Sequence, residues 1–318
     1  MIDVLRARQR IAPYVRRTPL VRSRWLSDAS GSEVWLKLES LQIEHSFKSR
    51  GAFNAVIARL ERENRPRQLV TASAGNHGRS LAAAAAAFGL PLVVFTPADA
   101  PAAKLDAIRR HGADLRADGR DYDEAERKAK AFARETGAEF ISPYSDRDVI
   151  DGAATIGLEL FEDLPQLDTL IIPIGGGGMI SGVGEVAKAI NPRVDVVGVE
   201  LDVSHVFQES LRAGHLVEIS AGASIADGLG GNADPDTITF DLIQRVVDRI
   251  VTVSEADLAA AITALVENEH LIAEGAGAAA SAAIASRRVA VRGRRAAAIL
   301  SGSNIDLAKL MAVVARRL

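Results

Sequence analysis

The fold class is clearest at residues 169–179, TLIIPIGGGGM, where a short apolar run passes directly into glycines. The run 169–174 has the composition of a buried strand in a parallel sheet. Consecutive glycines let backbone N–H groups close around a small anion, and the N-terminus of a following helix adds partial positive charge. The segment therefore predicts a phosphate site made by Gly175, Gly176, Gly177, Gly178 and Met179.

The same glycines would suit two further roles, and both stay open. One is a tight strand-to-helix turn with no ligand. The second is a dinucleotide site, which would need an acidic residue at the end of the next strand, a place that Glu200 occupies. A P-loop is excluded, because no Gly-Lys-Ser/Thr follows the glycines.

Short apolar runs alternate with helical patterns along the whole chain, which predicts an α/β fold with parallel sheets covered by helices. The expected strands are residues 34–38, 68–72, 92–96, 169–174, 194–200, 250–253 and 296–300. The expected helices include residues 53–63, 80–88, 102–110, 123–135 and 256–269. Ser254 and Asp257 resemble a capping box, and Gly89 and Gly112 are placed to end helices.

Three of the expected strands run into small-residue turns, at residues 73–78, 175–178 and 301–304. In parallel sheets, ligands bind at the carboxyl ends of strands. We therefore expect the three turns to lie on one sheet edge and to share a site.

Composition excludes several classes of protein. The net charge of -3 and the 4% aromatic content offer nothing for nucleic acid or anionic membrane. Without cysteine, the chain has no disulfide, thiolate metal site or cysteine nucleophile. No secretory or membrane-spanning apolar run is evident, so a cytoplasmic location is expected.

Lys48 is a candidate catalytic amine, although a single lysine is usually a solvated surface residue. Partial burial and a cationic neighbour such as Arg50 would lower its pKa and make it nucleophilic. His77 has two interpretations, an acid–base group or a buried histidine in a hydrogen-bonded turn. The other histidines lack metal-ligand spacing, so no metal site is predicted from them.

Four segments together resemble the serine/threonine dehydratase family, which includes the serine racemases and belongs to the fold type II (tryptophan synthase β-like) pyridoxal-phosphate enzymes. They are SFKSRGA at 46–52, SAGNHG at 73–78, GGGGM at 175–179 and SGSN at 301–304. The segments occur in the family's order over nearly the whole chain. The resemblance implies two open parallel-sheet domains with pyridoxal 5'-phosphate in a cleft between them.

The resemblance also implies roles for individual residues. Lys48 would hold the cofactor as an aldimine and remove the substrate Cα proton. Phe47 would pack on the cofactor ring, Asn76 would bind its 3-hydroxyl, and Ser301 would meet its nitrogen. The phosphate would lie on the glycine turn already described. The substrate carboxylate would be bound by Ser73, Ala74, Gly75, Asn76 and His77.

The implied reaction is dehydration of a threonine- or serine-type β-hydroxy amino acid to a 2-oxo acid and ammonia. A serine at the ring nitrogen, Ser301, cannot hold a proton there as an aspartate would, which favours prompt elimination. Ala74 stands where racemases have a proton-carrying serine, so dehydratase is preferred to racemase. The family's magnesium site is incomplete in this chain, because Val206 stands where a carboxylate ligand is expected. Glu200 is the carboxylate that could still serve as a ligand.

Different substrates and reactions stay open. The run ESLQIEH at 39–45 departs from the family pattern ENLQPTG. Phenylserine or 3-hydroxyaspartate is therefore an alternative substrate, and a β-replacement synthase or a non-catalytic binding protein is an alternative function. We expect a large domain from residues 1–44 and 143–318, a small domain from 45–142, and a homodimer, as the resemblance implies.

Overall fold

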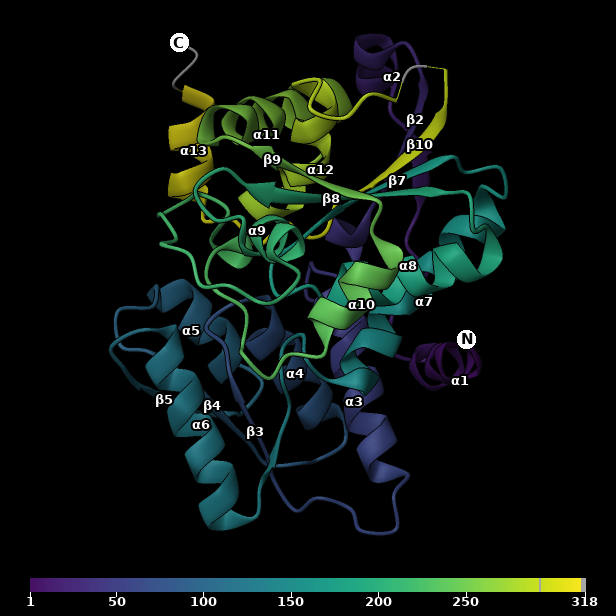
Figure 1. The fold of residues 1–318 in the computed structure, drawn as a ribbon. Helices are drawn as coiled ribbons and strands as arrows, with labels where there is room; N and C mark the ends of the chain where they lie inside the picture. Colours follow the sequence, from purple (N-terminus) through teal and green to yellow (C-terminus); the bar gives the residue numbers. More distant parts are fainter. Residues whose placement is uncertain (292, 316–318) are drawn as a thin grey trace. The chain divides into compact units, whose positions relative to one another are not determined.

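The computed structural model describes residues 1–291 and 293–315, which form two compact units (Figure 1). Unit 1 contains Met1, residues 17–47 and the chain from Ala154 onward; unit 2 contains Ile2–Arg16 and Lys48–Ala153. The predicted boundaries differ from these by three residues at 44/47, and by more at the N-terminus and at residue 142. The helix α1 (Ile2–Ile11) packs on α3 (Lys48–Leu60) of unit 2, and unit 2 continues to residue 153 because the first half of α7 (Arg147–Asp163) packs on α3.

Within the described residues, unit 1 is built on a six-stranded sheet of order β1-β2-β10-β7-β8-β9. All neighbours are parallel except β1 and β2, which pair antiparallel at the edge. The strands are β1 (Leu20–Arg22), β2 (Glu33–Lys37), β7 (Thr169–Pro173), β8 (Asp195–Leu201), β9 (Arg249–Val253) and β10 (Arg295–Ile299).

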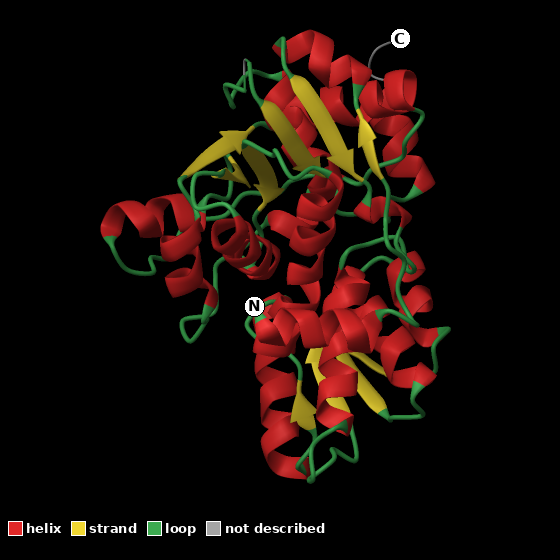
Figure 2. Ribbon diagram, turned by 90° about the vertical axis from the view of Figure 1, so that its right-hand side faces the viewer, coloured by secondary structure: helices red, strands yellow, loops and turns green. Residues whose placement is uncertain are grey.

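Helices cover both faces of this sheet, as Figure 2 shows. Alternate residues of each strand face opposite sides, so Ile171 belongs to one apolar core and Leu170 and Ile172 to the other. The helices of unit 1 are α2 (Arg24–Ser30), α8 (Gly178–Ile190), α9 (Val206–Ala213), α10 (Thr239–Val246), α11 (Glu255–Glu269), α12 (Gly275–Ala285) and α13 (Leu307–Ala315), with 3-10 turns at Glu39–Leu41 and Asp227–Leu229.

The described part of unit 2 is built on a four-stranded parallel sheet of order β5-β4-β3-β6. Its strands are β3 (Leu69–Ala72), β4 (Leu92–Pro97), β5 (Asp114–Gly119) and β6 (Glu139–Phe140). The helix α6 (Tyr122–Thr136) packs through Ala125 and Ala129 on one face of the sheet. The other helices are α3 (Lys48–Leu60), α4 (Asn76–Ala87), α5 (Ala102–Arg109) and α7 (Arg147–Asp163), which continues into unit 1.

The prediction of an α/β fold with two parallel-sheet domains is confirmed. The expected strands are all present within one or two residues, and the capping box of Ser254 and Asp257 forms at the start of α11. Gly89 and Gly112 adopt positive φ just after their helices, as expected. Within the described residues, no helix is long and apolar enough to cross a membrane.

Candidate active site

Lys48 is the first residue of α3 in unit 2. Its Nζ lies 2.6 Å from the carbonyl oxygen of Pro143, to which it donates a hydrogen bond. Burial lowers the pKa of the Lys48 ammonium to about 8. The proposed cationic neighbour, Arg50, is not a cause of this shift; its guanidinium is buried and donates to the carbonyl of Arg16 at 3.3 Å. Lys48 is therefore an amine that loses its proton near pH 8, well below an ordinary lysine, which favours reaction as a nucleophile.

The turn at residues 73–78 follows β3 and opens α4 in the same unit. The hydroxyl of Ser73 accepts the N–H of Gly75 at 3.2 Å. Gly75 is the N-cap residue of α4 and has no side chain, so it makes no side-chain cap to the first N–H groups of the helix. A Cβ on Gly78 would lie 2.2 Å from the carbonyl oxygen of Ser73, so glycine is required there. Such a turn suits a carboxylate or phosphate.

His77, the second residue of α4, is buried. Burial, and then the charge of Lys48, lower the pKa of His77 to about 3. The imidazole is therefore neutral at physiological pH, which disfavours a role as a proton donor and leaves it as a neutral polar group beside the lysine.

In unit 1, the glycine run joins β7 to α8. Gly177 is the N-cap residue of α8 at φ +86°, a left-handed conformation that favours glycine, and it has no side chain to cap the helix. A Cβ on Gly175 would lie 2.6 Å from the carbonyl oxygen of Gly228, and one on Gly177 would lie 2.7 Å from Ile243. Tight packing therefore explains two of the glycines, and the uncapped helix N-terminus remains as predicted for a phosphate site.

Ser301 and Phe47 lie at the same edge of the large sheet as the glycine run, because β10 pairs parallel to β7. Ser301 is buried and its hydroxyl donates to the carbonyl of Ala276 at 3.4 Å. The N–H of Phe47 donates to the carbonyl of Ser301 at 3.0 Å, and Ser46 forms a bridge with Gly302. The residue before Lys48 is thus fastened to the segment that carries Ser301.

The expectation that three turns share one sheet edge was wrong in part. The turns after β7 and β10 do share an edge of the six-stranded sheet, but the turn at 73–78 follows β3, in the four-stranded sheet of unit 2. The alternation of strands and helices does not reveal which strands pair, so the sequence could not separate one sheet from two.

Glu200, near the end of β8, accepts hydrogen bonds from two backbone N–H groups at the start of α9. It accepts the N–H groups of Phe207 at 2.9 Å and Gln208 at 2.8 Å. Burial raises the pKa of this carboxyl to about 7. The carboxylate caps a helix, which does not favour a ribose contact. Within residues 1–291 and 293–315, no group of three His, Asp or Glu side chains is placed to hold a metal.

Two features of the site carry no signal in the sequence. Pro143 contributes a backbone carbonyl, which no side-chain pattern indicates. Glu44 and His45 adopt positive φ just before the lysine segment, at 45° and 56°. The amide of Asn304 donates to the carbonyl of Glu44 at 2.9 Å, and the N–H of Ser303 donates to the carbonyl of His45 at 3.0 Å. Strained backbone of this kind is often found at functional sites.

Comparison with known proteins identifies the family. The family model described as "Pyridoxal-phosphate dependent enzyme" matches residues 11–302. An L-threonine ammonia-lyase of Thermotoga maritima is 41% identical over 96% of this chain and 75% of its own length. The structure of maize serine racemase has a TM-score of 0.92 at 32% identity, covering 99% of this chain and 97% of its own. Threonine deaminase isoform 2 of Solanum lycopersicum has a TM-score of 0.91 at 33% identity, covering 99% and 91%.

Proposed function

We propose that this chain, which belongs to the pyridoxal-phosphate-dependent enzyme family, is an ammonia-lyase that dehydrates L-threonine or L-serine to a 2-oxo acid and ammonia. The observation that carries the proposal is the part-buried amine of Lys48, whose pKa of about 8 suits both covalent attachment of a carbonyl cofactor and proton transfer. Pyridoxal phosphate, the family's cofactor, supplies an electron sink that weakens the substrate's Cα–H bond.

The residues present fit this cofactor. A part-buried amine with a lowered pKa lies at the start of α3, and a glycine-lined helix N-terminus lies at the start of α8. We propose that Lys48 bonds to the cofactor and that the backbone of Gly175, Gly176, Gly177, Gly178 and Met179 binds its phosphate. Phe47 and Asn76 would contact its ring, and Ser301 would donate to its nitrogen.

The substrate carboxylate would be held in unit 2, at the start of α4. Backbone N–H groups of Ala74, Asn76 and His77 would supply donors, and the helix N-terminus favours a negative charge. The N–H groups of Ser73 and Gly75 already donate to the carbonyl of Phe95 and the hydroxyl of Ser73, so these two residues would shape the turn. The neutral imidazole of His77 adds no positive charge to this site, because its pKa is about 3. Lys48, in the same unit, would take the Cα proton of the bound substrate at Nζ.

Elimination is preferred to racemisation because of the side chains present. Racemisation needs a second proton-carrying group on the opposite face of the substrate, and Ala74 has none. The likeness to maize serine racemase keeps racemisation as the second candidate. Incubation of the wild-type protein with L-serine tests this directly. We expect release of 2-oxo acid without D-serine, and accumulation of D-serine would contradict the preference for elimination.

The proposal is tested with a panel of β-hydroxy amino acids scored for 2-oxo acid and ammonia. L-threonine and L-serine should be turned over, and Lys48→Ala should abolish turnover while Lys104→Ala, on α5 of the same unit, retains it. Faster turnover of phenylserine or 3-hydroxyaspartate than of L-threonine and L-serine would make that amino acid the preferred substrate instead. Incorporation of sulfide in place of ammonia release would instead indicate a β-replacement synthase.

We further propose that the chain works in the cytoplasm as a homodimer, as the resemblance to its family implies. Light scattering coupled to gel filtration measures the mass of the assembly. A single-chain mass of 33.7 kDa across the working concentration range would contradict the homodimer.

A further inference from the structure

The helix α3 carries Lys48 at its first residue and Arg59 next to its last. The two positions are about three turns apart and share one face of the helix. Lys48 donates to the carbonyl of Pro143, and Arg59 binds the carboxylate of Asp146, three residues further along the chain. One helix therefore contacts the short segment between β6 and α7 at two points.

The segment is also held firmly at both of its ends. At its start, the N–H of Ile141 donates to the carbonyl of Val70 at 2.9 Å, and the hydroxyl of Thr71 donates to the carbonyl of Ile141 at 2.8 Å. At its end, one oxygen of Asp146 accepts the N–H groups of Asp148 at 3.0 Å and Val149 at 3.3 Å, which caps α7. The carbonyl of Pro143 lies between these anchors.

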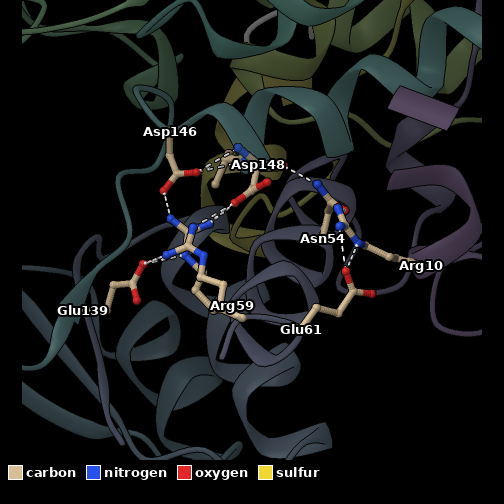
Figure 3. Close-up of polar contacts among 9 residues, drawn as sticks. Arg10, Asn54, Arg59, Glu61, Glu139, Asp146 and Asp148 are labelled. Atoms are coloured by element: carbon tan, nitrogen blue, oxygen red, sulfur yellow. Dashed lines mark hydrogen bonds and ion pairs between the residues drawn. The ribbon is translucent and has the colours of Figure 1, made fainter. Parts of the chain in front are cut away.

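Arg59 is the centre of the anchor at the α7 end (Figure 3). Its guanidinium is 6% exposed and reaches three carboxylates, at 2.5 Å from Asp146, 2.5 Å from Asp148 and 3.0 Å from Glu139. An arginine with three donors engaged in this way is held in one orientation. Among the described residues, Arg59 is the one cation that pairs with Asp146.

Direct contact between α3 and α7 couples this anchor to the lysine end. A Cβ on Gly51 would lie 2.6 Å from the carbonyl oxygen of Val149, and one on Gly152 would lie 2.4 Å from the carbonyl oxygen of Arg50. The amide of Asn54 donates to the carbonyl of Asp148 at 2.7 Å. The first turn of α3 thus rests on the backbone of α7, whose N-terminus is set by Asp146.

We infer that Arg59 and Asp146 are positioning residues for the Lys48 amine. Their ion pair holds the segment 142–146 so that the carbonyl of Pro143 faces Nζ, and this fixes the direction in which the amine approaches its target. The inference rests on the proposed function, in which Lys48 is the reacting amine. Neither residue touches the reacting atoms; both act through the carbonyl.

The test follows acetylation of Lys48 by mass spectrometry across pH in the full-length, cofactor-free chain. A carbonyl acceptor favours the charged ammonium, so Arg59→Gln should lower the pH midpoint of labelling by about one unit and speed labelling about fivefold at pH 7. Arg59→Lys should restore part of the wild-type midpoint. In the cofactor-loaded enzyme, Arg59→Gln should lower kcat and leave KM nearly unchanged.

Arg62→Gln is the matched control, because Arg62 binds Glu139 at 2.8 Å and Asp148 at 3.4 Å without reaching Asp146. It removes the same charge from the same cluster and should leave the Lys48 midpoint unchanged. Equal midpoints in Arg59→Gln and Arg62→Gln would overturn the inference, whatever their melting temperatures. If Arg59→Gln does not fold, the nearly isosteric Asp146→Asn decides by the same comparison.

The labelling readout concerns the amine itself and does not depend on cofactor attachment. Attachment of the cofactor to a different lysine in the wild-type protein would refute the proposed function and leave the labelling comparison intact. The two failures are therefore distinguishable.

Discussion

Capture of pyridoxal phosphate by the cofactor-free chain should follow the ionisation of Lys48. The neutral amine is the form that bonds to an aldehyde, and burial lowers the pKa of Lys48 from 10.5 to about 8. At pH 7 about a tenth of such amines are neutral, against about one in three thousand for a lysine with an unshifted pKa. The difference is about 300-fold in reactive amine, equivalent to about 3.4 kcal/mol.

Stopped-flow absorbance measures the capture rate across pH, with a small amine of known pKa run in parallel to correct for titration of the cofactor. The corrected rate should rise about tenfold per pH unit below pH 7 and level off above pH 8 to 9. Lys104→Ala should give the same profile. A corrected rate that keeps rising to pH 10 would show that Lys48 is an ordinary lysine and would refute the reasoning from burial.

Three further predictions concern stability, read from chemical denaturation. The pKa of Lys48 is lower in the folded chain than in the unfolded chain, so burial of its ammonium costs stability below pH 8 and costs nothing above pH 10.5. Lys48→Met should therefore stabilise the cofactor-free chain by about 1–3 kcal/mol at pH 7, and this gain should fade as the pH rises past 8. A gain that persists at pH 11 would contradict the prediction. Gly78→Ala should destabilise by about 2–4 kcal/mol, because its Cβ would meet the carbonyl of Ser73 at 2.2 Å; an unchanged unfolding midpoint would refute the contact. Lys37 and Glu159 form a buried ion pair at 2.5 Å, so Lys37→Met alone should cost about 3–5 kcal/mol and the double change with Glu159→Leu should cost less; additive losses would count against the pair.

The sequence was most informative where one segment carries its own signal. The strand at Thr169–Pro173 is buried throughout and is followed by glycines, and its end was predicted to within a residue. The strands β1, β5 and β6 were missed. β1 and β6 are three and two residues long, and β5 is a polar edge strand, DLRADG, whose pairing comes from its neighbour β4.

The start of α3 shows why local rules fail near a site. The expected helix covered residues 53–63, whereas α3 runs from Lys48 to Leu60 and includes Gly51, a poor helix former. Gly51 is needed there because α7 comes within 2.6 Å of where its Cβ would be. That contact joins residues about a hundred positions apart, and no local pattern announces it.

The ion pairs of Arg59 could not be predicted from the sequence for the same reason. Its partners Glu139, Asp146 and Asp148 lie more than 75 positions away, and each alone is indistinguishable from a surface charge. The candidate site was predictable to the extent that its residues form contiguous motifs. Contacts made by a backbone carbonyl, such as that of Pro143, could be identified only from the structure, because no side-chain pattern indicates them.

The central claim is that Lys48 carries the cofactor, and borohydride reduction of the loaded enzyme followed by peptide mapping tests it most directly. Reduction makes the link between the cofactor and its lysine permanent, so the modified residue is read from the peptide mass. We predict modification of Lys48 in protein that forms 2-oxo acid from L-threonine. Modification of another lysine, or none in a chain that still turns over threonine, would contradict the account.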